Sequence, residues 1–137
     1  MIQLSSSSFD GDSAELDRSL GFQVHAIESQ LLEKARVLQP GGNHHTWGEA
    51  LHQGNQSWVG LDPETLQTPY HELKEMCLWL DPQTGMKVVD LGAGYGRLAL
   101  VLETICSGVH FMGFELVSER VVEGNRILSD RHLISSA

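Results

Sequence analysis

The 137-residue chain has few basic residues, few cysteines and no long apolar run. Nine lysines and arginines stand against 18 aspartates and glutamates, which leaves a net charge of −9. Nucleic acids and anionic membranes both need a basic protein face, so we expect neither as a partner. No apolar segment approaches the roughly 18 residues of a membrane span. The N-terminus also lacks a secretory signal pattern, and we therefore expect a cytoplasmic protein.

The scarcity of cysteine bears on redox and metal chemistry. Cys77 and Cys106 each lie in a helical apolar pattern, which favours two buried thiols in a reducing compartment over a disulfide. Three of the seven histidines fall within residues 43–67, but no cysteine or paired carboxylate completes a ligand set there. We therefore expect no metal site, and we interpret this stretch as a connector anchored by Trp47 and Trp58.

The first half of the chain has the pattern of a short lead-in followed by helix. Residues 1–12 are rich in serine and lack periodicity, which predicts a flexible segment. Residues 13–67 are predicted to be a helical region and connector, in which Ser13 caps the first helix and Pro40 helps to end it. Apolar residues at steps of three and four predict that this helix is continuous over about seven turns. Its apolar stripe consists of Leu16, Leu20, Val24, Ile27, Leu31, Ala35 and Leu38.

Residues 68–137 alternate between helix and strand patterns. A helix opening at Thr68-Pro69-Tyr70 is followed by strands over 86–91 and 109–115, with one helix after each strand. This alternation predicts the right-handed βαβ connections of a parallel sheet. The last helix is predicted to begin with Ser118 as its cap. The expected buried face of the first helix consists of Leu73, Met76, Cys77 and Leu80.

Glycines alternate at the first strand–helix junction, in Val88-Val89-Asp90-Leu91-Gly92-Ala93-Gly94-Tyr95-Gly96. A side chain at Gly92 or Gly94 would occupy the space where a ligand meets the backbone, and some of these turns require positive φ. The helix that follows directs N–H groups at the same space. Glu115 ends the next strand 19 residues after Gly96, near the spacing at which an acid accepts hydrogen bonds from ribose hydroxyls. The combination predicts a nucleoside-cofactor site rather than a tight turn beside a surface glutamate.

The acid at position 90 separates two classes of cofactor. Dinucleotide sites favour G-x-G-x-x-G, with a pyrophosphate at the helix N-terminus. This chain has G-x-G-x-G instead, and Asp90 would repel a pyrophosphate. S-adenosylmethionine carries a sulfonium and an ammonium group, which suit a carboxylate. Charge therefore favours S-adenosylmethionine, and a fragment of a dinucleotide-dependent oxidoreductase is the less favoured alternative.

The nonapeptide at residues 88–96 resembles motif I of the class I S-adenosylmethionine-dependent methyltransferases. The acid in Gly113-Phe114-Glu115-Leu116 resembles the ribose-binding acid that follows this motif. Upstream, Thr68-Pro69-Tyr70-His71-Glu72-Leu73 resembles a pre-motif element of non-SET histone-lysine methyltransferases and bacterial relatives. The resemblance spans roughly residues 68–126. It leaves the methyl acceptor, protein or small molecule, unspecified and nominates no catalytic base.

In the glycine loop, the resemblance implies contacts with the methionine and ribose portion of the cofactor. The backbone of Gly92, Ala93 and Gly94 would line this portion. The carboxylate of Asp90 would face the ammonium group, directly or through water.

Outside the loop, the resemblance implies two further groups of contacts. Glu115 would hold the ribose hydroxyls, and Leu116 would pack on the adenine. Thr68, Tyr70 and Glu72 would approach the amino-acid tail from the other side, although helix capping and a solvated surface account equally well for these three residues.

The class I fold normally has about six or seven strands in on the order of 200 residues, whereas this sequence shows two strand patterns before it ends. We therefore expect an α/β fold that holds the first βαβα part of a Rossmann-like sheet, incomplete and preceded by a helical region. The leading interpretation is a methyltransferase present as a truncated, cofactor-binding N-terminal portion. The alternative is a non-catalytic oligomerisation or regulatory module. Open strand edges are unstable alone, so we also expect a homo-oligomer.

Overall fold

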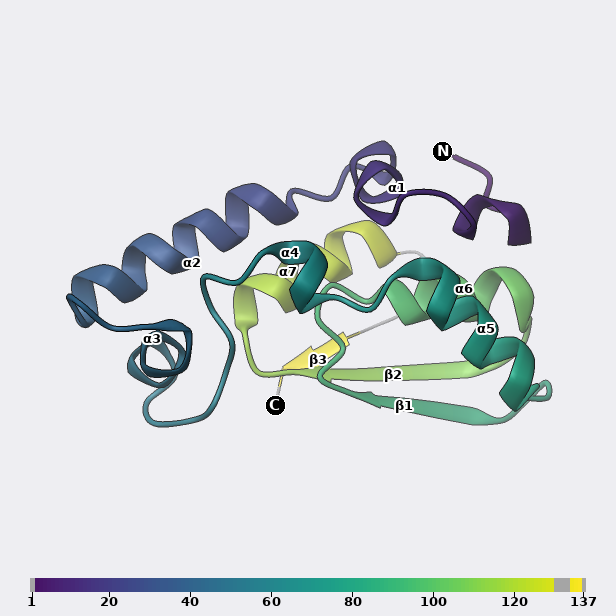
Figure 1. Cartoon of the computed structure of the whole chain (residues 1–137). Coiled ribbons are helices and arrows are strands. Elements are labelled where there is room, and N and C mark those ends of the chain that lie inside the picture. Colours follow the sequence, from purple (N-terminus) through teal and green to yellow (C-terminus); the bar gives the residue numbers. More distant parts are fainter. Residues whose placement is uncertain (1, 130–133, 137) are drawn as a thin grey trace. The chain divides into compact units, whose positions relative to one another are not determined.

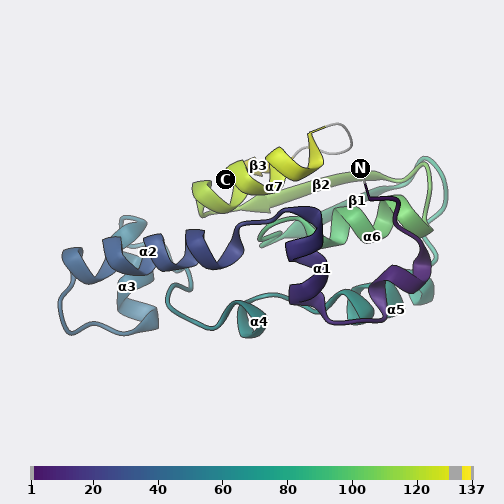
Figure 2. The same cartoon turned by 90° about the horizontal axis from the view of Figure 1, so that it is seen from above.

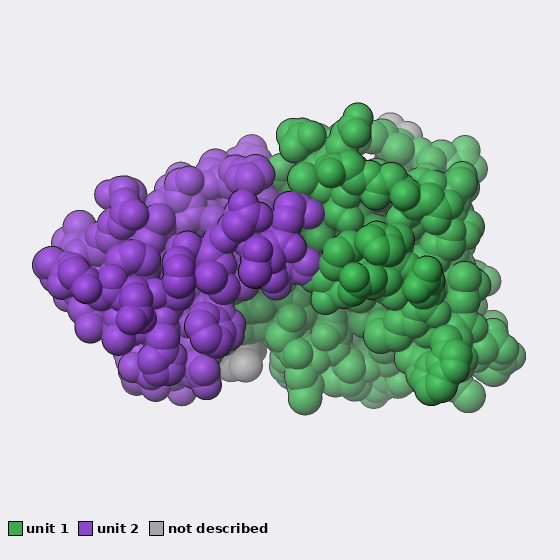
Figure 3. Space-filling view, viewed as in Figure 1, with its two compact units in different colours: residues 1–22, 68–137 green, residues 23–67 purple. Residues whose placement is uncertain are grey.

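A computed structural model describes residues 2–129 and 134–136 of the chain. The chain divides into two compact units, shown in green and purple in Figure 3. Unit 1 comprises residues 1–22 and 68–137, and unit 2 comprises residues 23–67.

Unit 2 consists of three helices, α2 (Val24–Leu38), α3 (His44–Leu51) and α4 (Pro63–Leu66). Helix α2 packs against both α3 and α4. The segment interpreted as a connector is thus partly helical. Its anchors include Trp47, whose indole N–H donates to the Gln39 carbonyl at 3.2 Å, and His44, whose Nδ1 lies 3.1 Å from the Val59 carbonyl oxygen.

Unit 1 is built around a parallel sheet of three strands in the order β1-β2-β3. The strands are β1 (Lys87–Leu91), β2 (His110–Glu115) and β3 (Ile134–Ser136). Helices α6 (Arg97–Ile105) and α7 (Ser118–Leu128) form the two connections. Figure 1 shows this βαβαβ arrangement, which corresponds to one half of a doubly wound nucleotide-binding fold. The predicted parallel α/β class is confirmed.

The third strand corrects the expectation that the sequence supplies only two. Residues 113–115 of β2 pair in parallel with residues 134–136. The sequence Ile134-Ser135-Ser136 is too short and too polar to stand out as a strand by periodicity, because strand signals need about four residues of alternation. An unpaired strand edge of β2 provides the template that the sequence pattern does not show.

The prediction of one continuous N-terminal helix is wrong, because the helical conformation is interrupted at Gly21. Helix α1 (Ser13–Leu20) ends there with Gly21 at φ +87°, and α2 starts three residues later. The Phe22 N–H donates to the Asp17 carbonyl and the Gly21 N–H to the Arg18 carbonyl. This is a Schellman cap, which favours glycine at the left-handed position. The apolar steps continue across the break, so periodicity alone hides it.

The N-terminal segment of unit 1 carries a core residue. A 3-10 helix, η1 (Ser6–Phe9), places the Phe9 ring in a fully buried position, stacked 5.6 Å from the Tyr70 ring. Asp12, rather than the predicted Ser13, caps α1 by accepting from the Glu15 N–H at 2.7 Å. The cap of α7 also differs from the prediction, because no side chain caps that helix.

Helices α6 and α7 lie on one face of the sheet, as Figures 1 and 2 show and as two successive right-handed connections require. Alternate residues of β1 and β2 accordingly face these helices or the opposite side. On the opposite side Leu91 is 81% exposed and Val89 is 50% exposed. Among the described residues of unit 1, no element covers this second face.

Helix α5 (Tyr70–Leu80) packs against α6 and η1. Its predicted buried face is only half correct. Leu73 and Cys77 are buried, but Met76 and Leu80 are 39% and 55% exposed. The helix contacts its neighbours along a narrow stripe, so residues one step away from the stripe face solvent.

Two further properties concern the described part of the chain. No described helix combines the length and apolar character that crossing a bilayer requires. The described residues also contain no group of three histidine, cysteine or acidic side chains placed to hold a metal ion.

Candidate functional site

The glycine loop joins the carboxyl end of β1 to the N-terminus of α6. Gly92, Gly94 and Gly96 all have positive φ, at +88°, +55° and +87°. A Cβ built on Gly92 or Gly94 would meet no protein atom within 4 Å. The space beside both glycines is therefore open, as the sequence pattern predicts for a backbone that a ligand approaches closely.

The loop is held to β2 by backbone hydrogen bonds. The N–H groups of Gly92 and Ala93 donate to the Phe114 carbonyl at 2.8 and 2.9 Å. The Gly94 N–H donates to the Glu115 carboxylate at 2.9 Å. The predicted ribose-binding acid is thus in direct contact with the predicted loop.

The two predicted acids lie on the same face of adjacent strands. Asp90 pairs in register with Gly113, two residues before Glu115, so both side chains point toward the helix-covered side. Burial raises the pKa of the Asp90 carboxyl, and the negative charge of Glu115 raises it further. Two neighbouring carboxylates that are partly removed from water favour a cationic ligand, because a positive charge offsets their mutual repulsion.

Glu115 is buried and makes two backbone contacts. One carboxylate oxygen accepts from the Gly94 N–H and the other accepts from the Val117 N–H, both at 2.9 Å. The guanidinium of Arg120, also buried, lies 3.9 Å from the carboxylate. Each carboxylate oxygen has a second lone pair, so these contacts leave acceptor capacity for hydroxyl groups.

The pre-motif residues do not share one environment. Thr68 and Glu72 are exposed, whereas Tyr70 is fully buried. The Tyr70 hydroxyl donates to Asp17 Oδ1 at 2.7 Å. The structure thus turns Tyr70 toward α1, and the Thr68 carbonyl accepts from Arg97 of α6 at 3.2 Å. Contact of these three residues with a cofactor tail remains a prediction.

Leu116 follows Glu115 directly and is half-buried. Its position after the strand end is the one that the resemblance implies for contact with adenine. No described interaction assigns it a partner, and its predicted role stays a prediction.

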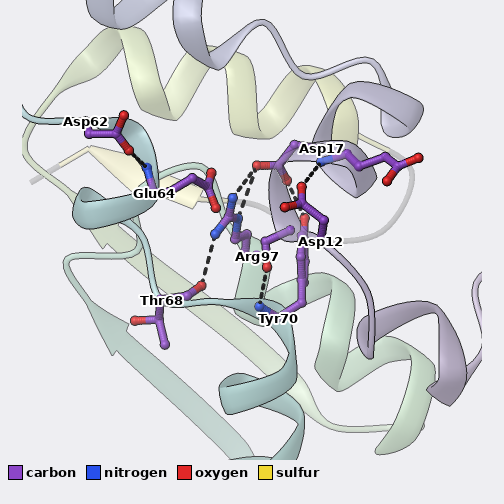
Figure 4. A network of polar contacts seen from close by, with 9 residues as sticks. Asp12, Asp17, Asp62, Glu64, Thr68, Tyr70 and Arg97 are labelled. Atoms are coloured by element: carbon purple, nitrogen blue, oxygen red, sulfur yellow. Dashed lines mark hydrogen bonds and ion pairs between the residues drawn. The ribbon is translucent and has the colours of Figure 1, made fainter.

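Asp17 and Arg97 form a buried ion pair that the sequence analysis missed. Arg97 Nε and Nη2 donate to Asp17 Oδ2 at 3.2 and 2.6 Å. The Arg97 guanidinium also lies 4.9 Å from the centre of the Tyr70 ring. Figure 4 shows the three side chains pointing toward one another from α1, α5 and α6. No local pattern reveals this pair, because 80 residues separate its members.

Gly113 is a second residue that the sequence analysis missed, although a signal was present. A Cβ on Gly113 would lie 2.8 Å from the Ala93 Cβ and 3.1 Å from the Phe111 ring. A glycine inside a strand indicates close approach of another segment. Here the segment is the glycine loop, which packs directly on β2.

The residues present fit an aminoacyl nucleoside with a positive charge. Gly92 and Gly94 leave open space beside the backbone, and Asp90 supplies a half-buried carboxyl group whose negative charge a cationic ligand would stabilise. Glu115 supplies hydroxyl acceptors one strand away. Residues 92–96 of the loop include no basic side chain for a pyrophosphate, and Arg97, which follows them, is paired with Asp17.

No family model and no curated protein matches the sequence significantly. Several solved structures match part of it. The C-terminal domain of precorrin-6Y C5,15-methyltransferase from Rhodobacter capsulatus aligns at 20% identity and a TM-score of 0.45, over 56% of this chain and 42% of that one. A TehB-like SAM-dependent methyltransferase from Corynebacterium glutamicum aligns at 15% identity and a TM-score of 0.42, over 82% and 45%.

The YcgJ protein from Bacillus subtilis aligns at 20% identity and a TM-score of 0.44, over 50% of this chain and 30% of that one. The chain thus spans less than half the length of each of these structures. At this level of similarity the matches establish neither a family nor a reaction. They include proteins described as methyltransferases, the class that the loop motif resembles.

Proposed function

We propose that this chain binds S-adenosylmethionine through the glycine loop and forms part of a methyltransferase. The observation that carries the proposal is the pairing of an open, glycine-lined backbone with two acids, Asp90 and Glu115, on the same face of adjacent strands. The ligand that suits this combination has hydroxyl groups and a positive charge. S-adenosylmethionine has both.

The roles follow from the chemistry of each group. Asp90 binds the ammonium group, directly or through water, and Glu115 accepts from the ribose hydroxyls while it continues to hold the Gly94 N–H. Leu116 packs on the adenine. Thr68, Tyr70 and Glu72 lie ahead of and within the first turn of α5, and they approach the amino-acid tail.

Methyl transfer places modest demands on the protein. The reaction is an in-line displacement at the sulfonium carbon, so positioning and electrostatics supply most of the catalysis.

Calorimetric titration with S-adenosylmethionine, S-adenosylhomocysteine and NAD tests the proposal. We expect the first two to bind and NAD not to bind. Binding should be lost in Asp90→Ala and in Glu115→Ala and kept in Glu75→Gln, an exposed acid on α5 that serves as the control. Binding of NAD alone would overturn the assignment.

A second candidate is an oligomerisation module, favoured by the uncovered face of the sheet. Within the described part of the chain, strand β1 pairs with a strand on one side only, and its Val89 and Leu91 are largely exposed. Such an edge is a template for pairing with another strand, and we propose a second copy of this chain as the partner. Light scattering at micromolar concentration that detects only a folded monomer would contradict this candidate.

A further inference from the structure

The glycine loop has few side-chain restraints of its own. Three of its five residues are glycines with positive φ, and no side chain caps the start of α6. Glycine-rich segments lose much conformational entropy when they are ordered. Whatever holds residues 92–96 in one conformation therefore has a direct effect on ligand binding at the loop.

The N-terminal segment contacts the end of the loop and the first residue of α6. Arg97, the first residue of α6, is paired with Asp17 of α1. Tyr95, which is 1% exposed, lies edge-on to the Phe22 ring at 6.4 Å between ring centres. Asp17 and Phe22 belong to the same helix and its cap. Asp17 lies in α1, and the Phe22 N–H donates to the backbone carbonyl of Asp17 just after the helix ends. Two contacts from one short segment thus restrain residues 95 and 97.

Burying the Asp17–Arg97 pair carries a cost in folding stability. Both side chains are buried, at 6% and 4% exposed. Desolvation of two charges offsets much of their attraction, and apolar residues of similar volume often stabilise a protein as well. In some proteins a buried ion pair is kept because it specifies one defined geometry, and we apply that explanation to this pair. Asp17 reinforces that geometry because its other oxygen is held by the Tyr70 hydroxyl, and the Tyr70 N–H is in turn held by Ser13 Oγ at 2.9 Å.

We infer that Asp17 is a positioning residue, which acts through Arg97 to hold the glycine loop in its ligand-binding conformation. The inference rests on the proposed function of the loop. It predicts that helix α1 is part of the ligand-binding unit rather than an appendage. Removing the Asp17 charge should loosen the loop even where the fold is kept.

The test compares Asp17→Asn with two controls in the full chain. Asp10→Asn removes the ion pair between Asp10, the residue after η1, and Lys74 of α5, which does not involve the loop. Val101→Ala truncates a fully buried residue of α6 away from the loop and reports the effect of lower stability by itself. Thermal unfolding first establishes that each variant is folded at the temperature of the binding measurement.

Two readouts are then collected. Hydrogen exchange in the ligand-free protein should accelerate at the Gly94 and Gly96 amides of Asp17→Asn and stay at the parent rate in both controls. Calorimetry with S-adenosylhomocysteine should show affinity weakened about tenfold in Asp17→Asn, the range typical of residues that couple to a site without touching the ligand. The controls should bind like the parent.

The outcomes separate this inference from the proposed function. If the parent does not bind S-adenosylhomocysteine, the proposed function fails, while the exchange rates still decide the role of Asp17. Parent-like exchange at Gly94 and Gly96 in folded Asp17→Asn would overturn the inference. Should Asp17→Asn fail to fold, Arg97→Lys, which keeps the charge but loses the two-point contact with Asp17, must show the same accelerated exchange.

Discussion

The carboxylate of Glu115, at the end of β2, accepts a hydrogen bond from the Gly94 N–H in the loop after β1, at 2.9 Å. Its other oxygen accepts from the Val117 N–H at the start of α7. One buried side chain thus holds the two strand–helix junctions together. The acid predicted to recognise a ribose also organises the loop predicted to meet the ligand.

Replacing Glu115 by glutamine tests this organising role. In Glu115→Gln the side-chain NH₂ faces one of the two backbone N–H groups, which is then left without an acceptor. The expected loss is about 1–3 kcal/mol in the free energy of unfolding, measured by denaturant titration. The exposed control Glu75→Gln should change stability by no more than about 0.5 kcal/mol. Equal stability of Glu115→Gln and the parent would show that the two bonds contribute little.

Replacing Asp90 by asparagine should raise stability and lower affinity. Because the folded-state pKa of Asp90 is raised, its stabilising contribution is complete below the unfolded pKa of about 3.9. That contribution is lost as pH rises through the folded pKa. Asp90→Asn should therefore melt above the parent near neutral pH, and the gap should close toward about pH 4.

Calorimetry of the same variant gives the functional half of this prediction. Affinity for S-adenosylhomocysteine near neutral pH should fall about tenfold or more, because a contact with a charged group is lost. A melting temperature that is lower than the parent's at neutral pH, with unchanged affinity, would contradict the role assigned to Asp90.

Gly92 and Gly85 form a matched pair that separates strain from ligand contact. Their φ values are +88° and +86°, and a Cβ at either position meets no protein atom within 4 Å. Alanine at either position should cost about 1–2 kcal/mol of stability from the left-handed backbone, read from thermal unfolding. Only Gly92→Ala should also abolish binding of S-adenosylhomocysteine. Parent-like binding by Gly92→Ala would place the ligand elsewhere.

Gly113→Ala tests the close packing of the loop on β2. The added methyl group would lie 2.8 Å from the Ala93 Cβ, so the loop or the strand must shift, at a cost of about 1–3 kcal/mol. The second substitution Ala93→Gly removes the opposing Cβ and should restore part of the lost stability, because the Phe111 ring still crowds the new methyl group. A double variant no more stable than Gly113→Ala would show that Ala93 is not the obstacle.

Local sequence patterns predict where the glycine loop and the two acids of the candidate site lie. The apolar run ending in Asp90, the alternating glycines and the acid at position 115 each reflect the geometry of a strand end, a tight turn or the next strand end. These features depend on neighbouring residues, so they can be recognised in the sequence. Gly21 and Gly113 were also visible as signals, of a helix cap and of close packing, but the apolar steps around them suggested uninterrupted elements.

The sequence by itself determined the parallel βαβ order, the glycine loop and the two acids, because hydrophobic periodicity and glycine φ preferences act over a few residues. Only the tertiary structure decided that Asp17 pairs with Arg97, that Tyr70 turns toward α1 and that residues 134–136 join the sheet. The fold determines which partner comes within reach of a buried charge. An open strand edge can also order a segment whose sequence pattern for a strand is weak. Both effects depend on the packing of segments that are distant in the chain.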